Sequence, residues 1–296
     1  MPRIGFRQRH PGRRKYDSRW PVGCHGAYAG HRTQFSSGLS AWPDLRRPVW
    51  GLPTPFGATG LPGEPRPMTQ HLEELIEAAR ELVSSGLVTG AGGNVSAREG
   101  DSMWISPSGF SFADAQAQHY PRISISSGEI LEGENRPSSE VLMHLQLYRV
   151  RPEVRAIVHA HPKMTVALTA AGHDLRPMYA DYYVYLGANV PHVPYTTVTT
   201  PELAAAVQAG FEAPDCQGMV LRNHGTICVG ESVKEALFRT LAMEEQAFIQ
   251  YHALTVGTPQ FLSDAQCADL DALDSEDYRR RLLAEMKTSG GVESQS

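Results

Sequence analysis

Two histidines spaced two residues apart give the first indication of chemistry in this chain. His159 and His161 lie at the end of the apolar stretch 155–158, which we expect to form a short buried strand that ends before Pro162. Residues two apart on a strand face the same side, so the imidazoles would lie about 6–7 Å apart along the backbone. That spacing suits two neighbouring ligands of one metal ion. Taken alone, the pair more often reflects one core histidine and one surface histidine.

A carboxylate and a third histidine are expected in comparable places. Glu140 lies in the first turn of a helix that Ser138 or Ser139 is predicted to cap, where the helix dipole alone also favours an acidic residue. His224 follows an apolar strand predicted over 218–223, where a histidine alone would be unremarkable. Strand ends and helix starts gather at one rim of a sheet, where sites usually form. Three imidazoles and one carboxylate in such places predict a divalent metal site, with Zn²⁺ preferred and Mn²⁺ as the alternative.

A second group of residues has the character of an anion-binding pocket. Positions 92–94 form a glycine-rich turn whose backbone N–H groups can face a ligand. A serine pair begins the predicted helix, and a helix N-terminus is a natural site for phosphate or carboxylate. Each of these features also has an ordinary interpretation as a turn or a helix cap. The candidate anion-binding residues are Gly93, Asn94, Ser108, Gly109, Ser138 and Ser139.

Helices and strands alternate along the central part of the chain. We expect helices over 69–85, 138–150, 162–171 and 232–254, and another that begins at Thr200 with Pro201 in its first position. Strands are expected over 95–98, 102–106, 155–161, 189–195, 218–223 and 226–229, with a hairpin over 123–131. Because several strands adjoin turn-linked partners, the sequence predicts an α/β fold with a mixed or antiparallel sheet.

Composition excludes several classes of protein. The 296 residues are 41% hydrophobic and 20% charged, which is ordinary for a globular protein. A net charge of −5 argues against nucleic acid as a partner, and no apolar run reaches the roughly 20 residues of a membrane helix. The four cysteines are scattered, which favours a reducing cytoplasm over a disulfide scaffold. We therefore expect a cytoplasmic protein with no membrane partner.

The two ends of the chain differ from its centre. Residues 1–68 are basic, poor in acids and rich in Pro and Gly, a composition that predicts a disordered extension. They contain neither the apolar core of a secretory signal nor the amphipathic pattern of a transit peptide, so neither targeting signal is expected. A helical pattern begins just after Met68, so Met68 is an alternative start of translation. The folded domain is expected over 69–260. Residues 261–296 are expected to hold a helix over 276–286 and a disordered tail.

Five short motifs, in their order and spacing, resemble the class II aldolase/adducin family, typified by L-fuculose-phosphate aldolases. They are Gly-Gly-Asn-Val-Ser (92–96), Ser-Pro-Ser-Gly (106–109), Pro-Ser-Ser-Glu (137–140), His-Ala-His-Pro (159–162) and Asn-His-Gly (223–225). The resemblance covers about residues 70–255. It implies a three-layer α/β/α fold around a mixed, largely antiparallel sheet, and a homotetramer with active sites at subunit interfaces.

The resemblance also implies roles for individual residues. Glu140, His159, His161 and His224 match the ligands of one divalent metal per subunit, and the six candidate anion-binding residues match the substrate-phosphate pocket. Glu140 would move a proton at carbon, and a tyrosine or Asp181, from a neighbouring subunit, would protonate the departing oxygen. The implied activity is that of a lyase. It would cleave a small ketose phosphate such as L-fuculose 1-phosphate by a retro-aldol reaction through a metal-stabilised enediolate.

Two departures from the family pattern keep other reactions open. Ala91 stands where fuculose-type aldolases have threonine, so a small carboxylate could replace the phosphate. The segment Ala180–Tyr183 is similar to one in the family's sugar-phosphate 4-epimerases, whose aspartate is an acid/base, although Asp181 also fits a turn cap. A decarboxylase or a 4-epimerase on the same metal site is therefore the alternative. A non-enzymatic adducin-like scaffold is disfavoured because all three histidines are kept, and a serine hydrolase because Gly-x-Ser-x-Gly does not occur.

Overall fold

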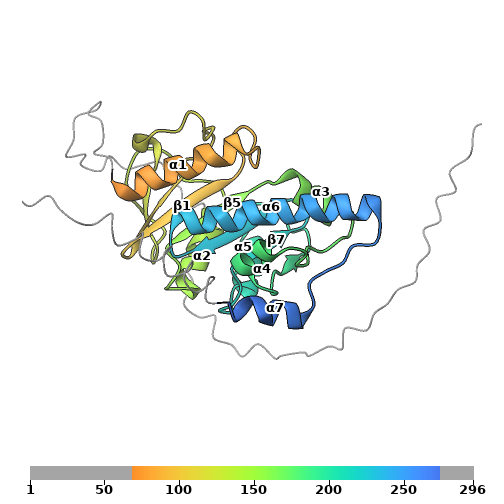
Figure 1. Cartoon of the computed structure of the whole chain (residues 1–296). Helices are drawn as coiled ribbons and strands as arrows, with labels where there is room; N and C mark the ends of the chain where they lie inside the picture. The colour runs from red at the N-terminus through yellow and green to blue at the C-terminus, as the bar shows by residue number, and fades with distance from the viewer. Residues whose placement is uncertain (1–68, 274–296) are drawn as a thin grey trace, which may run out of the picture. The chain divides into compact units, whose positions relative to one another are not determined.

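The computed structural model describes residues 69–273, in which helices and strands alternate (Figure 1). The helices are α1 (Gln70–Ser84), α2 (Val141–Val150), α3 (Lys163–Ala170), α4 (Ala180–Leu186), α5 (Pro201–Gly210), α6 (Val233–Val256) and α7 (Asp264–Asp271), with a 3₁₀ turn, η1 (Ala117–His119). The strands are β1 (Asn94–Glu99), β2 (Ser102–Ile105), β3 (Arg122–Ser124), β4 (Ile130–Glu132), β5 (Ala156–Ala160), β6 (His192–Val193), β7 (Gly218–Leu221) and β8 (Gly225–Gly230). The extension predicted over 1–68 and the helix and tail predicted over 276–296 lie outside the described residues.

The strands of the described region join one sheet in the order β4-β3-β2-β1-β5-β8-β7-β6. Each neighbouring pair is antiparallel apart from β6 and β7, which run parallel. The predicted mixed, largely antiparallel sheet is confirmed. Strand β5, which ends in the His-Ala-His sequence, lies inside the sheet between β1 and β8.

Helices cover both faces of this sheet, which confirms the three-layer α/β/α arrangement. Alternate residues of β5 separate two cores: Val158 packs with α1 and the start of α6, whereas Ile157 packs with α2 and α5 on the other face. Figure 1 shows α1 and α6 lying along the same side of the sheet. His159, two residues after Ile157, therefore belongs to the face that α2 covers.

The start of α2 differs from the prediction that a serine caps it. The N-cap residue is Glu140, which lies just outside the helix, and its side chain makes no capping hydrogen bond. Ser138 is held earlier in the chain because its N–H donates to the carbonyl of Ser106 at 3.0 Å. Its hydroxyl then accepts from the N–H of Glu140 at 3.3 Å. The observed helix therefore starts one or two residues later than predicted, which leaves the Glu140 carboxylate available to the site.

Other elements were predicted well or missed for local reasons. Thr69 and Thr200 cap α1 and α5 as expected. The strand predicted over 189–195 shrinks to β6, since the prolines on either side of it have no N–H to donate. Helices α4 and α7 were not expected. Within residues 69–273, no helix has both the length and the apolar character needed to cross a membrane.

Candidate metal centre

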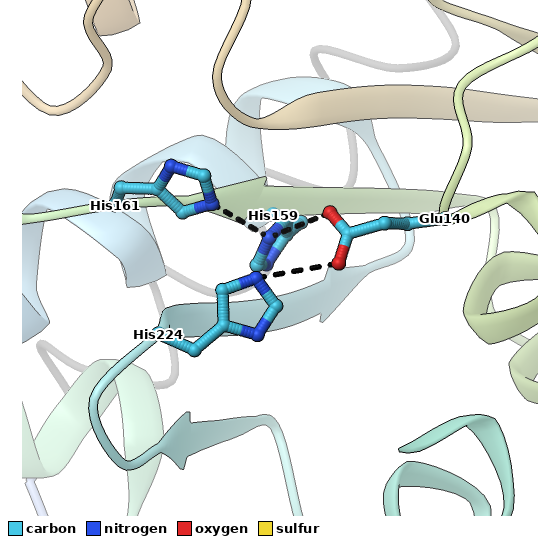
Figure 2. A group of neighbouring side chains, drawn as sticks. All are labelled: Glu140, His159, His161 and His224. Carbon is cyan, nitrogen blue, oxygen red and sulfur yellow. Dashed lines mark hydrogen bonds and ion pairs between the residues drawn. The ribbon is translucent and has the colours of Figure 1, made fainter. Parts of the chain in front are cut away.

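The four predicted metal ligands converge on one point in the structure (Figure 2). His159 lies in β5, His161 directly after it, His224 in the turn between β7 and β8, and Glu140 immediately before α2. One candidate ligand atom from each residue lies within 4.8 Å of all the others. The site therefore collects residues that are up to 84 positions apart, from Glu140 to His224.

The distances in this cluster suit a small divalent ion. The Nε2 atoms of His159 and His161 are 3.1 Å apart. Glu140 Oε2 lies 3.1 Å from His159 Nε2, and Glu140 Oε1 lies 3.3 Å from His224 Nε2. A tetrahedral zinc ion with bonds of about 2.0–2.1 Å separates its ligands by roughly 3.3 Å. The spacing of the donor atoms therefore fits an ion at their centre.

The tautomer of His159 is set by a backbone carbonyl. Its Nδ1 lies 2.8 Å from the carbonyl oxygen of Thr226, which can only accept, so Nδ1 carries the proton. The lone pair of Nε2 then points at the other ligands, and a lone pair facing a second imidazole at 3.1 Å is unfavourable without a cation or a proton between them. A carbonyl partner behind a histidine ligand is the usual support of a metal site.

The protonation states also favour metal binding. Burial, together with the repulsion that a protonated His159 or His224 would exert, lowers the pKa of His161 to about 4, which leaves it neutral near pH 7. Burial alone would raise the pKa of Glu140, but the charges and hydrogen bonds of His159 and His224 hold that pKa well below its usual range. Glu140 Oε1 is buried, and His224 Nε2, which lies 3.3 Å from it, belongs to a fellow ligand of the candidate site. A cation would satisfy Oε1.

A tight turn brings His224 to the cluster. Asn223 has a φ of 59°, a left-handed conformation that asparagine tolerates better than most residues. A Cβ atom on Gly225 would collide with the carbonyl oxygen of Ala160. The Asn-His-Gly sequence therefore lets β8 begin directly against the end of β5, which places His224 beside His161.

Comparison with known proteins agrees with this geometry. A family model described as Class II Aldolase and Adducin N-terminal domain matches residues 73–251. The chain belongs to the class II aldolase/adducin family. It is accordingly an aldolase-type enzyme of a class that uses a divalent metal, and its Glu/His cluster could bind one.

Individual relatives in this family differ in the reaction that they are named for. The 5-deoxy-D-ribulose 1-phosphate aldolase of Bacillus thuringiensis serovar kurstaki is 34% identical over 205 residues, which cover 69% of this chain and 94% of the relative. The 3-oxo-tetronate 4-phosphate decarboxylase of Escherichia coli K12 is 33% identical over 181 residues, or 59% and 83% of the two chains. A solved structure of L-fuculose 1-phosphate aldolase superposes with a TM-score of 0.64 at 29% identity and covers 69% and 95%.

The family's candidate anion-binding residues lie on three segments beside the metal cluster. Segments 106–109 and 136–139 run side by side, with the N–H of Ser108 donating to the carbonyl of Arg136 at 2.8 Å. Ser138 contacts the backbone of Glu140, and Gly109 and Ser139 are exposed. The Gly93 turn packs against the carbonyl of His159. The Asn94 side chain is directed inward, where its Nδ2 donates to Glu140 Oε2 at 3.0 Å.

Asp181 does not join the metal cluster of its own chain. It lies in the first turn of α4 and lines a hollow between α4 and α6 together with Tyr179 and Glu245. Any role for Asp181 in chemistry at the metal would have to be in the site of another subunit.

Three polar residues that lie behind Glu140 were not among the predicted site residues. His144 and Tyr148 follow Glu140 at intervals of four. Ser96 on β1 is hydrogen-bonded to both of them, and all three side chains are buried. The four-residue spacing was a readable signal, because residues i, i+4 and i+8 share one face of a helix.

Proposed function

We propose that this enzyme cleaves a small ketose phosphate, such as L-fuculose 1-phosphate, by a retro-aldol reaction that depends on one divalent metal per subunit, preferably Zn²⁺. The observation that carries the proposal is the convergence of three histidine Nε2 atoms and one ionised carboxylate in a member of an aldolase family. Two of the relatives described above are named for the cleavage of ketose 1-phosphates.

His159, His161 and His224 would hold the metal together with Glu140. When bound there, a divalent cation would polarise the substrate carbonyl and offset the charge left by breaking the neighbouring C–C bond. Glu140 would hold and move the proton at carbon. Its two oxygens are not equivalent, since Asn94 donates to Oε2 at 3.0 Å, whereas Oε1 lies 3.3 Å from Nε2 of the neighbouring ligand His224. Oε1 is therefore the oxygen we assign to proton transfer.

The anion pocket would anchor the far end of the substrate. Backbone N–H groups near Gly93 and Gly109 and the hydroxyls of Ser108, Ser138 and Ser139 are the donors that we assign to a phosphate, or to a small carboxylate in its place. This contribution is orientation, which keeps the reacting carbon in place relative to Glu140.

We further propose a homotetramer in which a neighbouring subunit supplies the acid that protonates the departing oxygen. Asp181 or a tyrosine is the candidate, because Asp181 lies away from the cluster of its own chain, on the surface of α4. The buried, unbridged Cys216, Cys228 and Cys267 support a reducing, cytoplasmic compartment.

Decarboxylation is the second candidate reaction, since a relative at 33% identity is named for it and Ala91 removes one hydroxyl from the pocket. A 4-epimerase on the same site is the third, supported by the Asp181 segment. Products distinguish the three reactions: an aldehyde with a three-carbon fragment, carbon dioxide, or an epimer of the substrate.

Metal content tests the proposal first. Wild type, His159→Ala and His224→Ala are purified and compared with the control His173→Ala, which changes an exposed histidine. We expect about one zinc or manganese per chain in wild type and control and a loss in both ligand variants, followed by cleavage of ketose 1-phosphates. A wild-type protein that takes up no divalent metal would refute the proposal.

A further inference from the structure

A line of buried polar side chains runs from Glu140 into the interior between β1 and α2. Asn94 Nδ2 lies 3.0 Å from Glu140 Oε2, and Asn94 Oδ1 is bonded to His144 Nε2. His144 Nδ1 lies 2.6 Å from Ser96 Oγ, which lies 2.9 Å from the hydroxyl of Tyr148. The exposed fraction of Asn94, Ser96, His144 and Tyr148 is at most 2%. None of these contacts is needed to fill a metal's coordination sphere.

The two elements that supply these side chains have matching periods. Asn94 and Ser96 are two apart on β1 and face one side of the sheet. His144 and Tyr148 lie on one face of α2, and Glu140, the N-cap residue four positions before His144, continues the same line. The line is therefore a seam between a strand and a helix, in which strand and helix residues alternate.

The direction of each hydrogen bond in the seam follows from the carboxylate end. Glu140 only accepts, so Asn94 turns its NH₂ toward Glu140 and its oxygen toward His144. That oxygen only accepts, so His144 carries its proton on Nε2. Because burial lowers the pKa of His144 to about 3 and keeps the ring neutral, its Nδ1 is unprotonated and accepts from Ser96 at 2.6 Å. The Ser96 oxygen then accepts from Tyr148.

Asn94, His144 and Ser96 thus donate toward Glu140, and the Tyr148 hydroxyl is shared between Ser96 at 2.9 Å and the carbonyl oxygen of Arg155 at 3.5 Å. We propose that His144, with Ser96 and Tyr148 behind it, is a positioning residue that fixes the Glu140 carboxylate through Asn94, so that Oε2 is held and Oε1 stays directed at His224 in the metal cluster. This inference rests on the proposed function only in taking Glu140 to be a metal ligand. His144 and Tyr148 touch neither metal nor substrate, and they act by limiting rotation of the carboxylate.

The test compares His144→Leu, His144→Gln and Ser96→Ala with the control Thr240→Val. The glutamine variant keeps an N–H for Asn94, whereas leucine removes it. Thr240 is also fully buried, and its hydroxyl bonds the carbonyl of Ala236 in its own helix, so its loss measures the effect of removing any buried polar group. The first readout is titration with Co²⁺, whose visible absorption reports the ligands around the ion.

We expect His144→Leu to bind Co²⁺ about 10- to 100-fold more weakly, with a changed visible spectrum, as is typical when the partner of a metal ligand is removed. Ser96→Ala should change the spectrum in the same direction by less. His144→Gln should lie near wild type, and Thr240→Val should match wild type. In cleavage assays kcat should fall by a similar factor in His144→Leu with KM little changed, because Ser108, Ser138 and Ser139, the hydroxyls assigned to the phosphate, are untouched.

Two results separate this inference from the proposed reaction. If His144→Leu and Ser96→Ala bind Co²⁺ with the spectrum and affinity of Thr240→Val, the positioning role is wrong, while retro-aldol cleavage by the wild type would still stand. If the spectra change as expected but wild type cleaves no ketose phosphate, the support of Glu140 stands and the reaction is wrong. Should His144→Leu fail to fold, an unchanged spectrum in Ser96→Ala alone overturns the inference.

Discussion

A single methyl group on Gly93 should damage the metal centre through the packing of the backbone. Gly93 has a φ of +73°, and a Cβ there would lie 2.8 Å from both the carbonyl oxygen of His159 and Val88 Cγ1. Gly90, three residues earlier in the same turn, has a φ of +61° and open space around its Cβ position. The two alanine variants therefore share the backbone strain and differ only in the collision with the strand that carries His159.

The expected losses of stability follow from these two contributions. A left-handed conformation costs an L-residue roughly 1–2 kcal/mol, which should be the whole effect of Gly90→Ala. Overpacking of a tight site adds about 1–3 kcal/mol, so Gly93→Ala should lose roughly 2–5 kcal/mol. For a domain of this size each kcal/mol lowers Tm by about 2–4 °C. Because the collision involves the backbone of a metal ligand, Gly93→Ala should also bind the ion more weakly.

Thermal unfolding with and without Zn²⁺ measures both effects. A ligand that binds only the folded state raises Tm, so zinc should stabilise wild type and Gly90→Ala by the same amount and Gly93→Ala by less. If the two variants lose equal stability and keep equal stabilisation by zinc, close packing of the turn against β5 is not what requires glycine at position 93.

Three other substitutions, at His144, Arg222 and Thr200, test separate parts of the structure. Burial lowers the pKa of His144 to about 3, so between about pH 6.5 and pH 3 the ring binds a proton in the unfolded chain but not in the folded one. The free energy of unfolding of the metal-free wild type should therefore fall as the pH falls through that range. In His144→Gln, the urea midpoint should therefore change less between pH 7 and pH 5, and an unchanged pH dependence would contradict the buried neutral ring. Arg222→Met removes a guanidinium that donates to the carbonyl of Thr169 and so anchors the turn that carries His224. The affinity for zinc, measured by calorimetry, should therefore fall in this variant, and an affinity equal to that of wild type would exclude the anchoring role. Thr200→Ala removes the cap of α5 and should cost about 0.5–2 kcal/mol in urea unfolding with metal content unchanged, whereas a loss of metal would show that α5 is coupled to the site.

The sequence predicted the ligands of the candidate site because each adjoins a strongly patterned element. His159 ends an apolar run that Pro162 closes, and His224 follows another such run, so local signals were enough to select them. The meeting of these ends depends on strand order, with β5 beside β8, and no local pattern specifies that order. The pattern of strands and turns predicted a mixed or antiparallel sheet, and the motif resemblance added the three-layer arrangement.

Errors occurred where long-range contacts override local preference. Ser138 has the chemistry of a cap, yet its pairing with Ser106 holds it outside the helix and gives the N-cap position to Glu140. Helix α4 has only seven residues, and its pattern is too short to be read. By contrast, the capping box of α7, formed by Ser263 and Gln266, was present in the sequence and could have been recognised.

The hydrogen bonds around Glu140 distinguish the two oxygens of its carboxylate, which neither the sequence motif nor the fold does. A carboxylate has two chemically identical oxygens, and the sequence alone gives no reason to separate them. The structure gives Oε2 a buried donor from Asn94, with further donors aligned behind it, and gives Oε1 only the neighbouring ligand His224 at 3.3 Å. Rotation of the carboxylate would break the bond to Asn94 and leave that buried amide unpaired, at a cost of about 1–3 kcal/mol. This cost is what would keep one oxygen fixed while the other exchanges a proton.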